Sequence, residues 1–131
     1  MGTAFGHPVR VRWRDTDALG HVNHAVFLTY LEEGRDAFFT QVLESEPAYV
    51  VVRIELDLRA EIGLTQRNLT VRVEVERIGT TSVTTRELIL APSGEVAAQA
   101  RVVSVRWDPQ QRKPVPFSDE QRTQLAGHLA P

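Results

Sequence analysis

The chain has 131 residues, the size of one ordinary domain, and 42% of them are hydrophobic, which is enough for a single core. The 15 Lys and Arg residues nearly balance the 17 Asp and Glu residues, whereas a dedicated nucleic-acid binder usually shows a basic excess. Because the chain contains no cysteine, a disulfide framework, a thiolate zinc site and a cysteine nucleophile are excluded. We expect one domain over residues 1–131 and no nucleic-acid partner.

The sequence also predicts a cellular compartment. The N-terminus lacks a charged-then-apolar leader, and the longest apolar runs are far too short to cross a bilayer. We therefore expect a cytoplasmic protein without a membrane partner.

The first expected element is a half-buried strand that ends at Trp13. Val9, Val11 and Trp13 alternate with arginines at positions 10, 12 and 14, and a period of two is typical of a strand with one buried face. The arginines are interpreted as the solvated face. Residues 15–23 follow as a loop that contains two carboxylates, a glycine, a histidine and an asparagine.

Residues 24–44 are expected to form an amphipathic helix with Asn23 as its N-cap. The face expected to be buried consists of Phe27, Tyr30, Leu31, Gly34, Ala37, Phe38, Gln41 and Val42. On the polar side, Glu32 and Arg35 are spaced to pair one turn apart. Gly34 costs about 1 kcal/mol relative to Ala in a helix interior, and a close approach to a sheet would compensate for it.

Four further strands are expected after the helix. Residues 50–58 and 69–75 alternate apolar and polar side chains, whereas 82–91 and 95–107 are rich in β-branched and apolar residues. Tight turns at residues 79–81 and 92–94 indicate hairpins between neighbouring strands.

The last part of the chain predicts a short helix. Asp108 and Pro109 end the final strand, and Ser118 with Gln121 three residues later is typical of a capping box. The complete order is β-α-β-β-β-β-α, which indicates an α+β fold. One antiparallel five-stranded sheet would wrap around the one long helix that can cover its apolar face. Because an open sheet leaves edges that are commonly protected by pairing, a dimer with a continuous sheet is expected.

The loop before the long helix has the composition of a reactive site. A helix N-terminus presents free N–H groups and a partial positive charge, and a carboxylate placed opposite them has the parts needed to attack a carbonyl and stabilise an oxyanion. Asp17 is the main candidate, although an Asx-turn would also explain it. Asp15 is interpreted as structural, paired with an arginine or a backbone N–H.

Carboxylates and imidazoles are also suitable metal ligands. However, His21 and His24 are only three residues apart, and no distant cluster of ligands supports them. We therefore expect no metal site.

These residues carry a resemblance to a known family. The run Asp-Thr-Asp-Ala-Leu-Gly-His-Val-Asn at 15–23, followed by a helix with Tyr-Leu-Glu-Glu-Gly-Arg at 30–35, resembles the hotdog-fold acyl-CoA thioesterases, most closely the 4-hydroxybenzoyl-CoA thioesterase branch. The resemblance covers nearly the whole chain. It implies a hotdog homodimer, often paired into a homotetramer, with active sites at the dimer interface and no cofactor.

The resemblance also implies roles for particular residues. Asp17 takes the place of the catalytic carboxylate, and the backbone N–H of His24 that of the carbonyl-polarising donor. Asn23 and His21 are further catalytic candidates, Glu33 on the helix is a reserve candidate, and the residues implied in substrate binding are Gly20, Phe27, Thr81 and Ser82.

Three positions depart from the family pattern. His24 stands where many relatives have a second asparagine, Phe27 where tyrosine is frequent, and Thr81 where an arginine or lysine often contacts the nucleotide phosphates. The leading hypothesis is a thioesterase that hydrolyses an acyl-CoA or aroyl-CoA to the free acid and CoA. The alternative is a non-catalytic hotdog module that binds acyl-CoA. A hotdog dehydratase would need a histidine that residues 25–44 do not contain.

Overall fold

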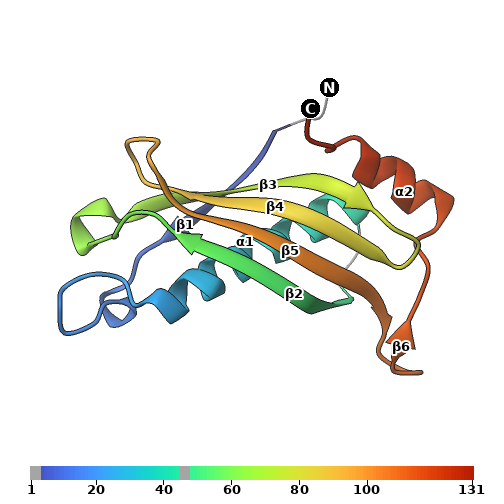
Figure 1. Cartoon of the computed structure of the whole chain (residues 1–131), viewed down its shortest axis with the longest axis horizontal. Coiled ribbons are helices and arrows are strands. Elements are labelled where there is room, and N and C mark those ends of the chain that lie inside the picture. Colours follow the sequence, from blue (N-terminus) through green and yellow to red (C-terminus); the bar gives the residue numbers. More distant parts are fainter. Residues whose placement is uncertain (1–3, 45–47) are drawn as a thin grey trace.

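A long helix lies on the concave side of a curled antiparallel sheet in the computed structural model, which describes residues 4–44 and 48–131 (Figure 1). In chain order the elements are β1 (Phe5–Arg10), a 3-10 turn (Trp13–Asp15), α1 (His24–Leu43), β2 (Tyr49–Leu58), a 3-10 turn (Leu64–Gln66), β3 (Asn68–Ile78), β4 (Ser82–Leu90), β5 (Val96–Asp108), β6 (Lys113–Pro114) and α2 (Asp119–Ala126). The expected order and α+β class are confirmed. The short strand β6 pairs with β5 and makes the sheet six-stranded instead of five-stranded.

The strand order in the sheet is β1-β3-β4-β5-β2, with every pair antiparallel. The hairpins β3–β4 and β4–β5 turn where the sequence predicts, at residues 79–81 and 92–94. Helix α1 connects β1 and β2, which lie at opposite edges of the sheet (Figure 1). The chain therefore begins the sheet at one edge, crosses its concave face as a helix, and returns at the other edge.

The first strand ends earlier than the alternating pattern predicts. Val9 and Val11 are buried as expected, but β1 stops at Arg10 and Trp13 lies in a 3-10 turn with 80% of its surface exposed. The turn forms because the Arg12 backbone N–H donates to Asp15 Oδ2 (2.9 Å) and the Asp15 N–H donates to the Arg12 carbonyl (2.9 Å). These local hydrogen bonds take the place of the ladder that a longer strand would need.

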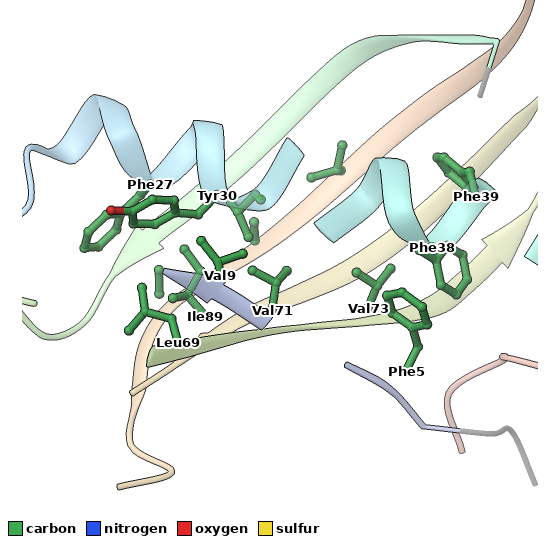
Figure 2. Close-up of a cluster of buried hydrophobic side chains, with 14 of the residues drawn as sticks. Phe5, Val9, Phe27, Tyr30, Phe38, Phe39, Leu69, Val71, Val73 and Ile89 are labelled. Atoms are coloured by element: carbon green, nitrogen blue, oxygen red, sulfur yellow. The ribbon is translucent and has the colours of Figure 1, made fainter. Parts of the chain in front are cut away.

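The buried face of α1 is close to the predicted one. Asn23 caps it, since its Oδ1 accepts the Ala25 N–H at 2.9 Å. Figure 2 shows Phe38 of the helix near Val73 and Phe5 of the sheet, and Tyr30 toward the end of the cluster that contains Val9. The prediction was wrong for Gln41, which is exposed, and it missed Arg35 and Phe39, which are buried. The Phe39 ring lies 4.8 Å from that of Tyr49 at the start of β2, which explains its burial.

Gly34 marks the closest approach of α1 to the sheet. A Cβ built on this residue would lie 2.3 Å from Val71 Cγ1 and 2.7 Å from Val71 Cβ. Real Cβ atoms do not come this close to a branched core side chain, so only glycine lets the helix lie at this depth. The predicted compensation for a glycine in the helix interior is confirmed.

We expect Gly34→Ala to destabilise the protein by about 1–3 kcal/mol, although alanine is the better helix former, because overpacking outweighs propensity. Urea unfolding measures the loss. In the Val71→Ala background the same substitution should cost clearly less, since the clashing methyl groups are gone. Equal losses in both backgrounds would contradict the proposed contact.

Arg35 pairs with the sheet and not with its helix neighbour. Its Nε and Nη2 atoms donate to Glu87 Oε2 and Oε1, both at 2.9 Å, and the Thr85 hydroxyl donates to Oε2 at 2.6 Å. All three residues are buried. Because the Arg35 side chain is directed into the core toward Glu87, the predicted Glu32–Arg35 pair is wrong. Burial by itself would lower the pKa of Arg35, but the hydrogen bonds and charge of Glu87 raise it above its ordinary value. Arg35 therefore stays charged between helix and sheet.

Arg35→Met is expected to cost about 3–5 kcal/mol in unfolding free energy, because it leaves the Glu87 carboxylate buried without its cation. The double variant Arg35→Met/Glu87→Leu should recover much of that loss, since no charge remains buried. Chemical denaturation of the two variants and the parent tests this. A double variant less stable than Arg35→Met would contradict the explanation.

Strand β2 is covered less well than the rest of the sheet. Helix α1 packs mainly on β1, β3 and β4, and α2 packs on α1 and β3. Ile54 and Leu58 of β2 pair with the buried Val102 and Ala98 of β5, but they remain 41% and 51% exposed. An apolar strip thus continues beyond the edge of the helix.

Within residues 4–44 and 48–131, no helix is long and apolar enough to cross a membrane.

Candidate active site

The loop between β1 and α1 is held by backbone hydrogen bonds to itself and to the loop after β2. The Asp17 N–H donates to the His21 carbonyl (2.9 Å), and the Gly20 N–H donates to the Asp17 carbonyl (3.0 Å). Gly20 has φ +83°, a conformation that favours glycine. The Val22 N–H donates to the Ile62 carbonyl at 2.7 Å, which ties this loop to the segment after β2.

Asp15 joins the loop to the helix from inside the protein. Its Oδ2 accepts the Tyr30 hydroxyl at 2.6 Å and the Arg12 N–H at 2.9 Å, and Arg12 Nε lies 3.6 Å away. Burial would raise the pKa of Asp15, but these hydrogen bonds and the Arg12 charge outweigh it and hold the pKa below its ordinary value. Burial, and then Asp15, raise the pKa of Tyr30. The structural role predicted for Asp15 is confirmed, and the Tyr30 contact adds to it.

Tyr30→Phe is expected to lower the unfolding free energy at pH 7 by about 1.5–3 kcal/mol, the range for a hydrogen bond to a charged group. Because Asp15 has a lowered pKa in the folded state, its contribution is complete above the unfolded pKa of about 4 and is lost as the pH falls through the folded value. The difference between the variant and the parent should therefore shrink as the pH falls below about 4 and through the lowered pKa of Asp15. Urea unfolding at neutral and acid pH measures this, and an undiminished difference at acid pH would count against it.

Asp17 uses its two carboxylate oxygens differently. Oδ1 accepts the Leu19 N–H at 2.9 Å, so the Asx-turn is present. Oδ2 lies 3.5 Å from His21 Nδ1, and about 29% of the side chain is exposed. One oxygen thus orients the carboxylate, while the other faces a histidine, and Asp17 itself lines a cavity. The two alternative explanations for Asp17 are therefore compatible.

The N-terminus of α1 opens to the same cavity. His24 is the first residue of the helix, directly after the Asn23 cap. Asn23 provides acceptors for the N–H groups of Ala25 and Val26, through its side chain and its carbonyl. Within the part of the chain that the structure describes, the His24 N–H has no acceptor, so this donor and the positive end of the helix dipole are available to a ligand.

The cavity has a volume of about 310 Å³. Its wall is formed by Asp17, His21, Val22, His24, Phe27, Leu58, Arg59, Ala60 and Glu61. Arg59 belongs to the wall, whereas Arg67 lies outside it and donates from Nε to the Leu64 carbonyl at 3.2 Å. A carboxylate, a helix N-terminus and an apolar wall thus converge in one hollow.

The other predicted site residues lie elsewhere. Glu33 is on the exposed face of α1 and outside the cavity wall. Ser82 pairs with Val105 of β5, which in turn pairs with Val50 of β2. Along the strand direction, Thr81 and Ser82 are therefore level with the start of β2, whereas the cavity lies near the end of β2. That separation is roughly 25 Å at the rise of a β-strand. One protomer therefore does not bring the predicted residues into one site.

No group of three or more His, Cys, Asp or Glu side chains in residues 4–44 and 48–131 is arranged to hold a metal ion.

Comparison with known proteins extends this description. The family model described as the thioesterase-like superfamily matches residues 11–125. Long-chain acyl-CoA thioesterase FadM of Escherichia coli is 28% identical over 124 residues, which is 89% of this chain and 93% of that protein. Acyl-CoA thioester hydrolase YbgC of Escherichia coli O6:H1 is 31% identical over 119 residues, 86% of this chain and 88% of that protein.

A solved structure shows the same similarity. The thioesterase from Thermus thermophilus, complexed with coenzyme A and zinc, has a TM-score of 0.83 to this chain at 35% identity, and covers 96% of this chain and 95% of its own. The fold and these comparisons define a hotdog thioesterase. The chain belongs to the thioesterase-like superfamily.

Proposed function

We propose that the protein hydrolyses the thioester of an acyl-CoA or aroyl-CoA to the free acid and CoA, with Asp17 as the reacting carboxylate. One observation carries this proposal: Asp17 and the first residue of α1, His24, line one cavity whose wall also includes the buried Phe27. The names of FadM and YbgC, and the coenzyme A in the Thermus structure, support the substrate class.

Asp17 has two possible routes, both of which the geometry supports. As a general base it takes a proton from water, whose oxygen then attacks the thioester carbon. As a nucleophile it attacks the carbon itself and forms a mixed anhydride, which water hydrolyses. In either route the carbonyl oxygen gains negative charge, and we propose that the His24 N–H donates to it, which its place at the start of α1 and in the cavity wall supports. The Leu19 N–H holds Oδ1, so Oδ2 is the oxygen that reacts.

Asp17→Asn should lower kcat by at least about 100-fold and leave the fold intact, because an amide neither takes the proton nor attacks the carbon effectively. Free-thiol release from short, long and aromatic acyl-CoAs measures activity, and thermal unfolding checks the fold. Asp119→Asn, at the exposed start of α2 and away from the cavity and from β2, is the matched control and should retain activity. Full activity of Asp17→Asn would refute its assignment and make Glu33 the next candidate.

The non-catalytic alternative makes a different prediction in the same experiment. A binding module would bind acyl-CoAs without releasing thiol from any of them, for the wild type and the Asp17→Asn variant alike. Calorimetric binding to the folded wild type, together with no turnover across the panel, would favour that alternative.

We further propose that the protein is a dimer joined through β2. Of the two sheet edges, β1 has six residues and includes Pro8, which cannot donate to a neighbouring strand. β2 has ten residues and no proline, and it leaves Ile54 and Leu58 partly uncovered. A two-fold axis at β2 would place the start of one strand beside the end of the other. It would thus bring the partner's Thr81–Ser82 turn toward the cavity.

Ile54→Lys is expected to shift the assembly toward monomer, because it puts a charge into the apolar strip at the proposed interface. Light scattering coupled to gel filtration measures the mass against the 14.7 kDa chain and distinguishes dimer from tetramer. His7→Lys on β1 is the control and should leave the mass unchanged. A monomeric wild type would contradict the interface.

A further inference from the structure

Three ionisable side chains from two loops form a row at the cavity, and one of them, Glu61, has no place in the reaction described above. His21 Nδ1 lies 3.5 Å from Asp17 Oδ2, and His21 Nε2 lies 4.0 Å from Glu61 Oε2. Each ring nitrogen thus faces a different carboxylate. The other titratable or charged groups in the cavity wall are His24 and Arg59.

The backbone holds these two loops together. His21 and Gly63 form an antiparallel bridge, and the Val22 N–H donates to the Ile62 carbonyl at 2.7 Å. A Cβ on Gly63 would lie only 3.6 Å from the Gly20 carbonyl oxygen, so the loops are in contact. Ile62 is fully buried and anchors the residue next to Glu61 in the core. The position of Glu61 opposite His21 therefore follows from packed backbone.

Exposure increases along the row. About 29% of the Asp17 side chain, 31% of the His21 side chain and 79% of the Glu61 side chain are accessible in the protomer. Such exposed ion pairs contribute little to folding, because solvent screens them and ordering the side chains costs entropy. The row is therefore better explained by proton transfer than by stability.

We propose that Asp17, His21 and Glu61 form a proton relay that carries the proton taken from the attacking water out to solvent. The inference rests on the proposed thioesterase function, and it selects the general-base route for Asp17. It assigns Glu61 as a positioning and proton-accepting residue that acts through His21.

The steps balance as follows. The water oxygen bonds to the thioester carbon while one water proton passes to Asp17 Oδ2, and the C–S bond then breaks with its electron pair on sulfur. Asp17 passes its proton to His21 Nδ1, His21 releases the proton on Nε2 to Glu61, and Glu61 releases it to bulk water. The second proton leaves when the acid product ionises, and the thiolate takes one proton from solvent. The net change is thioester and water to carboxylate, thiol and one proton, and solvent exchange restores the histidine tautomer.

Glu61→Gln tests the relay with the acyl-CoA that the wild type hydrolyses fastest. In dilute buffer its kcat should fall about tenfold with KM unchanged, a smaller effect than loss of the primary base. Added imidazole or phosphate at constant ionic strength should restore kcat, because a buffer base then accepts the proton directly. Glu61→Asp should retain more activity than Glu61→Gln. Glu95→Gln, with the same charge change on the exposed turn after β4, should match the wild type.

Other results of these experiments would overturn the relay or the proposed function. An undiminished kcat for Glu61→Gln in dilute buffer, or a loss that buffer does not restore, would overturn the relay while wild-type turnover still supports the thioesterase. Incorporation of oxygen-18 into Asp17 during a single turnover in labelled water would also overturn it, because that label marks the anhydride route. Absence of turnover by the wild type itself would instead overturn the proposed function on which the relay rests.

Discussion

The depth at which α1 lies against the sheet is the constraint on which the rest of the structure depends. Gly34 lets the helix backbone come within contact of Val71, and Arg35 beside it reaches Glu87 in the core. A larger residue at Gly34 would push the helix outward and break the geometry of that ion pair. The position of the helix then decides which strands are covered, and it leaves β2 with apolar side chains partly exposed.

The same helix also positions the proposed site. Its N-terminus points into the cavity, and Tyr30, one turn past Phe27, holds Asp15 through a buried hydrogen bond. Because Asp15 lies two residues before Asp17, the loop cannot shift without breaking a contact to the core. Packing at the middle of the helix and chemistry at its start are thus connected through Tyr30.

The proposed site combines a buried, hydrogen-bonded part with a part that is open to solvent. Asp15 and Tyr30 are buried and hydrogen-bonded to each other, whereas Asp17 and His21 are partly accessible and Glu61 is mostly exposed. The hydrolysis proposed for Asp17 needs a buried anchor beside an accessible carboxylate, since water must reach the carboxylate and the proton must leave. The separation of Thr81 and Ser82 from this cavity supports a site completed by a second protomer.

Local patterns in the sequence determined the helix bounds, the Asn23 and Ser118 caps, the hairpin turns and the loop with Asp17, because each depends on periodicity or on hydrogen bonds within a few residues. The alternating pattern misplaced the end of the first strand, since hydrogen bonds around Asp15 compete with the ladder. Only the tertiary structure decided that Arg35 pairs with Glu87, that Asp15 binds Tyr30 and that Glu61 faces His21. The partners are 15 positions apart for Asp15 and Tyr30, 40 for His21 and Glu61, and 52 for Arg35 and Glu87. The packing of the helix on the sheet brings such distant side chains together, and no local periodicity in the sequence predicts which ones meet.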